Sequence, residues 1–149
     1  MKLRFVDARN TDYLMLAQKL DEYYFKLVGD VQLRYAEANR PENMACLIVA
    51  YDNDIPVGCG CWKRVNQTTA EVKRIFVMPE YRRQGVASAI IRKLEGSIAQ
   101  AGYSHIILET ARTTSDSKAL YLSLGYQEID YFGSPAGAEN CLCFEKKVN

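Results

Sequence analysis

The segment from residue 70 to residue 109 constrains the fold of this chain more than any other part of the sequence. Ala70–Met78 and His105–Glu109 have the apolar character of buried strands. Between them, the helical spacing over residues 85–101 is set by Ala87, Ile90, Ile91, Leu94 and Ile98. Two strands joined by one helix are expected to run parallel through a right-handed crossover. The chain is therefore predicted to hold a parallel strand pair inside a mixed α/β sheet.

The remaining segments complete a predicted order of β-α-α-β-β-β-α-β-α-β-β. The first helix is expected over residues 12–28, with Thr11 as its N-terminal cap and Gly29 at its end. The strands outside the crossover follow one another through short turns, so most of them are expected to be antiparallel. Further elements are predicted at residues 2–6, 30–38, 44–52, 56–65, 117–124, 126–131 and 141–147. The predicted fold class is α/β (α+β), with helices covering a mostly antiparallel sheet.

Bulk composition narrows the classes of protein to consider. A chain of 149 residues suits one domain spanning 1–149, and a formal net charge of +1 gives no general attraction for nucleic acid. The longest apolar runs are too short to cross a membrane and no N-terminal targeting pattern is visible, so a cytoplasmic location is expected. The five cysteines lack C-x-x-C spacing and there is one histidine, so buried free thiols are expected rather than a metal or redox site.

The turn before the crossover helix carries the chemistry of an anion site. Arg82 and Arg83 supply cationic donors, while Gly85 and Ala87 leave room for a ligand to approach the backbone. The start of a helix adds free N–H groups and about half a positive charge. The chain has neither G-x-x-x-x-G-K-[ST] nor G-x-G-x-x-G, which excludes the common triphosphate and dinucleotide loops. A plain helix start is the alternative to a phosphate site.

Two segments together resemble the GNAT superfamily of acyl-CoA-dependent N-acetyltransferases. Residues 82–87, R-R-Q-G-V-A, are similar to the family's phosphate signature [Q/R]-x-x-G-x-[G/A]. Residues 119–126, A-L-Y-L-S-L-G-Y, are similar to its A-x-x-L-Y-x-x-x-G-[F/Y] segment. The small residue expected before that tyrosine is Ser117, whereas Thr114 stands where an asparagine often contacts the pantetheine arm. The resemblance covers roughly residues 45–147.

The resemblance implies the GNAT fold, with parallel central strands that splay apart, and acetyl-CoA as co-substrate. Thr114 and Ser117 are implied beside the pantetheine arm. Tyr121 stands in place of the tyrosine that often protonates the departing thiolate; a core tyrosine between helix and sheet is the alternative. The other residues implied at the cofactor are Ile75, Phe76 and Val77 along the strand, and Arg82, Arg83, Gln84, Gly85, Val86 and Ala87 at the pyrophosphate.

Several groups compete for the role of general base. Glu71 begins a strand at a place where some members of the family have a glutamate that works through water; the alternative is a solvated strand-end carboxylate. Glu109 lies at the carboxyl end of the next parallel strand, a favourable zone for ligands. Histidine is a common general base, but His105 lies at the opposite end of that strand. Glu71 and Tyr121 are the catalytic residues that we predict, with a water chain as the alternative base.

The acceptor is predicted to be a primary amine, on a small molecule or a peptide, that attacks acetyl-CoA directly. Aromatic side chains that would line an acceptor pocket, or pack helices onto the sheet, are Tyr23, Tyr24, Tyr35, Tyr131 and Phe132. Acidic side chains that would attract a cationic amine, or form an exposed helix face, are Asp21, Glu22, Asp30 and Glu37. The rivals are a CoA-binding regulatory module without turnover and an enzyme for a longer acyl-CoA. A homodimer is an expectation of the fold alone, and neither nucleic acid nor membrane is an expected partner.

Overall fold

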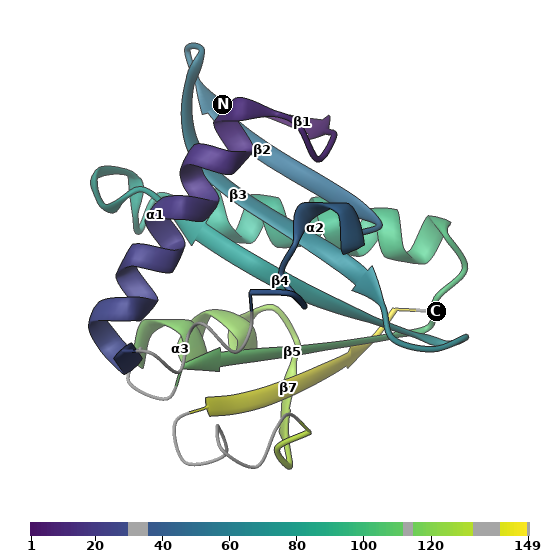
Figure 1. Ribbon diagram of the computed structural model, residues 1–149. Coiled ribbons are helices and arrows are strands. Elements are labelled where there is room, and N and C mark those ends of the chain that lie inside the picture. The colour runs from purple at the N-terminus through teal and green to yellow at the C-terminus, as the bar shows by residue number, and fades with distance from the viewer. Residues whose placement is uncertain (30–35, 112–114, 133–140, 149) are drawn as a thin grey trace.

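A single twisted sheet forms the centre of the molecule (Figure 1). The computed structural model describes residues 1–29, 36–111, 115–132 and 141–148. Within these residues, seven strands pair in the order β1-β2-β3-β4-β5-β7-β6. The strands are β1 (Lys2–Val6), β2 (Cys46–Asp52), β3 (Ile55–Arg64), β4 (Thr69–Val77), β5 (His105–Ala111), β6 (Gln127–Ile129) and β7 (Cys141–Lys147).

The strand directions confirm the predicted mixed sheet. β4 and β5 are parallel, and every other pair in the sheet is antiparallel. The connection between the parallel strands is α2 (Val86–Gln100), as the apolar spacing of that segment predicted. The other helices are α1 (Thr11–Val28) and α3 (Ser115–Ser123), with short 3-10 turns at η2 (Pro41–Asn43) and η3 (Pro79–Tyr81).

The ends of α1 correct one prediction and confirm another. The N-terminal cap is Asn10 rather than Thr11, because its extended backbone lets the side-chain oxygen accept from Tyr13 N–H at 2.9 Å. At the other end Gly29 takes a φ of 65° and donates its N–H to Phe25, so the helix ends where the glycine predicted. Of the second helix expected over 30–38, residues 30–35 lie outside the described residues and the rest form a turn.

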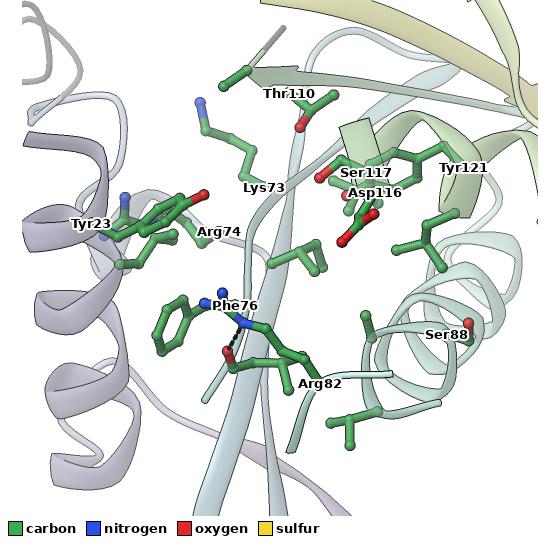
Figure 2. A pocket seen from close by; sticks show the side chains of 18 of the residues that line it. Tyr23, Lys73, Arg74, Phe76, Arg82, Ser88, Thr110, Asp116, Ser117 and Tyr121 are labelled. Atoms are coloured by element: carbon green, nitrogen blue, oxygen red, sulfur yellow. Dashed lines mark hydrogen bonds between the residues drawn. The ribbon is translucent and has the colours of Figure 1, made fainter. Parts of the chain in front are cut away.

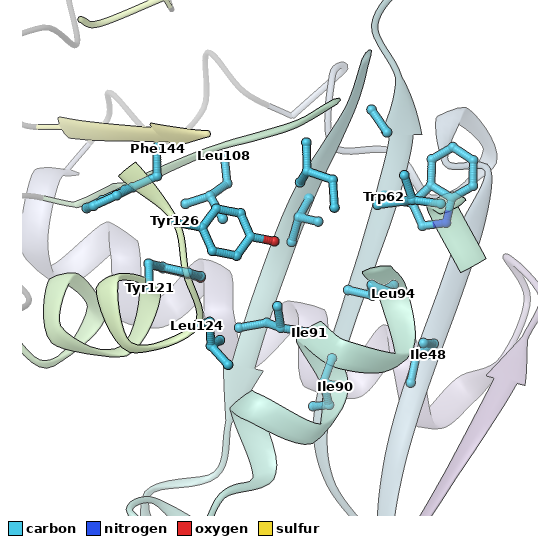
Figure 3. Packing of buried hydrophobic residues seen from close by; sticks show 14 of the residues in the cluster. Ile48, Trp62, Ile90, Ile91, Leu94, Leu108, Tyr121, Leu124, Tyr126 and Phe144 are labelled. Carbon is cyan, nitrogen blue, oxygen red and sulfur yellow. The ribbon is translucent and has the colours of Figure 1, made fainter. Parts of the chain in front are cut away.

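Helices cover both faces of the sheet, and each face has its own hydrophobic core (Figure 1). On one face α1 packs Tyr13, Leu16 and Leu20 against Leu47, Val49 and Phe76 of the strands. On the other face α2 and α3 share the larger core with the sheet, and Figure 3 shows its side chains closely grouped. The members contributed by α2 are Val86, Ile90, Ile91, Leu94 and Ile98. The burial of this stripe accounts for the apolar spacing that the sequence displays.

Close packing of α2 on β3 depends on Gly60. A Cβ placed there would lie 2.6 Å from Ile75 Cδ1 and 2.8 Å from Ile90 Cγ2, closer than real Cβ contacts. We expect Gly60→Ala to lower the free energy of unfolding by about 1–3 kcal/mol, because both neighbours are packed against the core. Urea denaturation measures this change.

The matched control for that prediction is Gly96→Ala, which adds the same methyl group inside α2. Nothing lies within 4 Å of a Cβ at Gly96. Since alanine is the better helix former, this variant should gain about 0.5–1 kcal/mol. Equal unfolding curves for Gly60→Ala and the wild type would contradict the packing described for this glycine.

A bulge and a splay interrupt the middle of the sheet. In the β3–β4 ladder, Cys59 faces Phe76 but Cys61 faces Lys73, so β4 holds one extra residue there, and Arg74 takes a φ of 62°. The parallel pairing of β4 with β5 runs only from Thr69 opposite His105 to Val72 opposite Leu108. After Val72 and Leu108 the two strands separate: β4 continues to pair with β3, and β5 continues to pair with β7. The predicted splay of the parallel strands is therefore present, and it opens a gap.

Candidate active site

A cavity of about 910 Å³ extends through the gap between β4 and β5. Ala70 and Val72 belong to the core under α2, so Glu71 and Lys73 point to the opposite, α1 face. The cavity is lined by side chains of both faces: Leu20, Tyr23, Tyr24, Glu71, Lys73 and Arg74 on the α1 side, and Val86, Ala87, Ser88, Ser117, Leu120 and Tyr121 on the other. Figure 2 shows Tyr23 on one side of β4 and Ser88, Ser117 and Tyr121 on the other. The cavity is thus lined from both faces of the sheet, on either side of the gap.

The N-terminus of α2 forms one wall of this cavity. Gly85 has a φ of 82° and occupies the cap position, and its carbonyl accepts from Ala89 N–H at 3.0 Å. The N–H groups of the first helical turn lack intrahelical acceptors, and residues 85–88 all line the cavity. A Cβ at Gly85 would meet nothing within 4 Å, so the space in front of this turn is open. The predicted anion site therefore opens into the cavity.

The three polar side chains of the turn before α2, those of Arg82, Arg83 and Gln84, make different contacts. Arg82 donates from Nε to the Val77 carbonyl at 2.9 Å and lies over the rings of Tyr23 and Phe76, at 5.6 Å and 5.8 Å (Figure 2). Its guanidinium thus links the separated end of β4 to α1. Arg83 pairs with Asp116 at 3.1 Å. Because this ion pair is exposed, it contributes little to stability, and the Arg83 side chain can turn to a ligand. Gln84 donates to the Glu80 carbonyl and, among the described residues, is outside the cavity lining.

The end of β4 turns backbone groups toward the gap. Met78 N–H donates to the Val57 carbonyl of β3 at 2.8 Å. Because N–H groups of successive strand residues point to alternate sides, Val77 N–H points away from β3, into the gap. Ile75 lies on the α2 face and Phe76 on the α1 face, and all three residues line the cavity.

Tyr121 is both a core residue and a wall of the cavity. Its ring packs against Tyr126 and Phe144, each at a centroid distance of 5.7 Å. Burial, with a smaller contribution from Tyr24, raises the pKa of the Tyr121 phenol, so its proton is retained at neutral pH. Ser117, one turn earlier in α3, also lines the cavity, whereas Thr114 lies outside the described residues.

Two carboxylates line the α1 side of the gap. The Glu71 side chain is 15% exposed and lies 3.7 Å from Lys73 Nζ. Burial raises the pKa of Glu71, opposed by Lys73 and Lys63 and reinforced by Glu109, which lines the same cavity. His105 begins β5, and among the described residues it is not part of the cavity lining. The geometry therefore favours the two glutamates over the histidine as proton acceptors.

The aromatic and acidic side chains expected near an acceptor divide into two groups. Tyr23 and Tyr24 line the cavity, and burial raises the pKa of Tyr24 to about 12. Tyr131 and Phe132 lie outside the lining formed by the described residues, and Tyr35 and Asp30 fall outside those residues altogether. Asp21 pairs with Arg74 at 2.8 Å, Glu37 pairs with Arg40 at 3.6 Å, and Glu22 is exposed beside a second hollow. Tyr23 and Tyr24 therefore line the cavity, whereas Asp21, Glu22 and Glu37 are not part of the lining formed by the described residues.

The sequence interpretation missed several residues of the cavity. The additional lining residues with polar side-chain groups are Asn39, Lys73, Arg74, Tyr81, Ser88, Thr110, Asp116 and Ser123. Ser88 had a usable signal, because it follows the phosphate-type turn within the first turn of a predicted helix. Lys73 alternates regularly with Glu71, so its face followed from the strand pattern, whereas Arg74 had no signal because its placement depends on the bulge.

The cysteines are free thiols, and Cys59, Cys61 and Cys143 are buried as expected, whereas Cys46 and Cys141 are half-buried. Cys59 and Cys61 donate to the carbonyls of Arg74 and Lys73, next to the bulge. Burial raises the pKa of Cys61 to about 12, which makes this thiol unreactive. The described residues contain no cluster of three or more potential metal ligands. None of the helices in that part of the chain is both long and apolar enough to span a bilayer.

Comparison with known proteins agrees with this geometry. The model of the acetyltransferase (GNAT) family matches residues 10–126. The chain is 33% identical over 127 residues to the uncharacterized N-acetyltransferase YjcF of Bacillus subtilis, covering 85% of this chain and 87% of that one. It is 34% identical over 92 residues to human N-acetyltransferase 8, of which it spans 40%. A GNAT-family acetyltransferase structure from Staphylococcus aureus superposes with a TM-score of 0.78 at 15% identity, over 99% of this chain and 100% of the other.

These matches establish the class of the protein. The split sheet with a helix N-terminus at its gap is the acetyltransferase fold that the two sequence segments indicated. The chain belongs to the GNAT acetyltransferase family.

Proposed function

We propose that the protein transfers an acetyl group from acetyl-CoA to a primary amine, with both substrates bound together. The observation that carries this proposal is the single cavity lined from both faces of the sheet, because it lets two molecules meet in the gap from opposite sides. Direct attack then needs no acyl-enzyme intermediate. Uniting the reactants in one enclosed site converts a bimolecular step into a nearly unimolecular one.

The coenzyme fits the α2 side of the cavity. Its pyrophosphate would accept hydrogen bonds from the amides of residues 84–87, with Arg83 turning from its surface partner to add charge. The pantetheine arm would lie along the unpaired edge of β4, where Ile75 and Val77 offer backbone groups, and beside Ser117 of α3. A structure of the same fold, the PaiA N-acetyltransferase of Thermoplasma acidophilum, is a complex with coenzyme A, which supports this assignment.

The chemistry uses groups on both sides of the gap. The amine nitrogen attacks the thioester carbonyl, the C–N bond forms and the C–S bond breaks, with Val77 N–H placed to stabilise the developing oxyanion. The Tyr121 hydroxyl donates a hydrogen bond to the departing sulfur. Since the thiol is more acidic than this buried phenol, most of the benefit is a hydrogen bond to the thiolate rather than full proton transfer. Glu71 accepts the proton of the amine, through water.

A thiol-release assay with acetyl-CoA and a panel of primary amines tests the proposal. We expect CoA to be released at a rate that depends on the amine and saturates with it. Tight binding of acetyl-CoA without turnover on any amine would instead favour a CoA-binding regulatory module. Replacing acetyl-CoA by longer acyl-CoA thioesters in the same assay tests the chain length that the cavity accepts.

The role of Glu71 predicts a specific pH dependence. Its raised pKa means that the carboxyl group keeps its proton to a higher pH than an ordinary glutamate, whose pKa is about 4.3. A base works deprotonated, so kcat/KM should rise with pH through this raised pKa. Glu71→Gln should lower kcat/KM about 100-fold and remove that acid limb.

Glu109→Gln is the matched control, since Glu109 lies on the same face and lines the same cavity. This variant should keep the acid limb, displaced slightly to lower pH because a neighbouring negative charge is lost. A profile that keeps its limb in Glu71→Gln and loses it in Glu109→Gln would assign the base to Glu109 instead.

A further inference from the structure

The bulge in β4 places two consecutive cations on the acceptor side of the gap. Lys73 is on the α1 face together with Glu71, and the extra residue of the bulge brings Arg74 to the same face (Figure 2). Regular alternation would have turned Arg74 to the α2 face, into an apolar core. Both side chains line the main cavity. This side of the gap therefore holds two cations beside the carboxylates of Glu71 and Glu109.

Arg74 is the more enclosed of the two cations. Its side chain is 6% exposed, and Nη2 donates to Asp21 Oδ1 at 2.8 Å and to the Ala17 carbonyl at 3.0 Å. Nε is shielded from solvent and has no hydrogen-bond partner among the described residues. A buried donor on a charged group is costly to leave unpaired, so this N–H favours a ligand that supplies an acceptor.

The surroundings of Arg74 place that ligand in the acceptor half of the cavity. Arg74 and Asn39 line both the main cavity and a second hollow of about 480 Å³ between α1 and residues 36–41. Asn39 Oδ1 is also buried without a partner among the described residues. The proposed coenzyme side of the cavity lies across β4 from both residues.

We propose that the acceptor is an amino-carboxylate, a small molecule that carries a carboxylate beside its primary amine, and that Arg74 Nε donates to that carboxylate. This inference rests on the proposed acyl transfer. The ammonium group of the same molecule would approach Glu71 and Glu109, which lie on the same face next to the gap. Arg74 here is a specificity residue, which selects the acceptor and takes no part in the proton transfers.

Charge and hydrogen-bond geometry favour a carboxylate over other groups. A neutral acceptor atom would form a weaker hydrogen bond with the charged guanidinium than a carboxylate oxygen would. A dianionic phosphate would add two negative charges to a site that already holds the carboxylates of Asp21, Glu71 and Glu109. One N–H offered by Nε matches one carboxylate oxygen, because Nη2 is already engaged.

The test uses matched acceptors with the unmodified protein. Each set of acceptors contains an amino acid, its amide and its decarboxylated amine, and the separation of amine and carboxylate increases from set to set. All of them are compared in the thiol-release assay. We expect kcat/KM to be about 10- to 100-fold higher for the carboxylate at the best separation, as a charged hydrogen bond requires. Equal rates for the three members of every set, or a preference for a phosphate-bearing amine, would overturn the inference.

Variants of Arg74 and Asp21 test whether the Arg74 guanidinium causes the preference for a carboxylate over an amide. Arg74→Met should bring the carboxylate-to-amide ratio to about one by lowering only the carboxylate rate, while Arg64→Met, at the exposed end of β3, should leave the ratio unchanged. Asp21→Asn keeps the guanidinium and an oxygen that can accept from it, but removes the negative charge that competes with a ligand carboxylate. It should therefore raise the ratio, and it serves if Arg74→Met fails to fold. A ratio unaffected by both changes would contradict the role of Arg74.

The two proposals fail in different ways. Thiol release from amines and amides at rates equal to those of amino-carboxylates would remove this inference and leave the acyl transfer standing. Absence of thiol release with every member of every set would remove both, provided that the protein is folded and the coenzyme is present in excess.

Discussion

Gly85→Glu is expected to weaken the binding of CoA by about 100-fold or more. The new carboxylate would stand at the first turn of α2, where the proposed pyrophosphate meets free N–H groups, and like charges repel strongly at close range. The side chain would enter open space, since a Cβ at this position has no neighbour within 4 Å. The change therefore acts on ligand charge and not on core packing. Isothermal titration calorimetry with CoA measures it.

Gly102→Glu is the matched control for that substitution. Gly102 also has a positive φ, of 96°, and a Cβ placed on it would also meet nothing within 4 Å, but it follows the far end of α2. Both variants should carry a similar cost for placing a non-glycine residue in the left-handed region. Only Gly85→Glu should lose affinity for CoA. Equal affinities of the two variants would mean that the turn does not bind the pyrophosphate.

Tyr121→Phe is expected to lower kcat about 100-fold and to leave the affinity for acetyl-CoA nearly unchanged. The hydroxyl interacts with sulfur only as the thiolate leaves, so its removal affects the transition state and not the bound coenzyme. Because burial raises the pKa of the phenol, the wild-type tyrosine remains protonated through neutral pH and produces no alkaline limb there. Steady-state kinetics and calorimetry on the same preparation separate the two effects.

The neighbouring Tyr126 provides the control for loss of a buried hydroxyl. Tyr126 packs against Tyr121 and donates to Glu95 Oε2 at 2.9 Å, away from the gap. Tyr126→Phe should lower the free energy of unfolding by about 1–3 kcal/mol, because it leaves Glu95 with one donor fewer, and should keep kcat close to the wild-type value. A Tyr121→Phe variant with unchanged turnover at every pH would leave Tyr121 as a core residue only.

The elements around the gap were largely predictable from sequence. The apolar stripe of α2 and the two apolar strands on either side of it determine the parallel pair, because each must bury one face. Gly85 marks the start of α2, since its φ of 82° is a conformation that favours glycine. Glu71 and Tyr121, which are far apart in the chain, do line one cavity.

What the sequence did not predict depends on contacts between distant segments. The bulge at Arg74 follows from how β4 pairs with β3, and no local pattern marks it. The engagement of Arg82 with the Val77 carbonyl follows from the path of the turn, so a residue assigned to phosphate also holds the strand end. Asn10 and Thr11 are both good caps, and the backbone of the preceding turn decides between them.

The central claim is that the cavity through the split sheet binds coenzyme A at the start of α2. Calorimetric titration of the folded wild-type protein with CoA, and then with acetyl-CoA, tests it most directly. The account predicts saturable heat with both ligands at one site per chain, and a higher melting temperature in their presence. A cooperatively folded protein that gives no heat and no change in melting temperature with either ligand would contradict it.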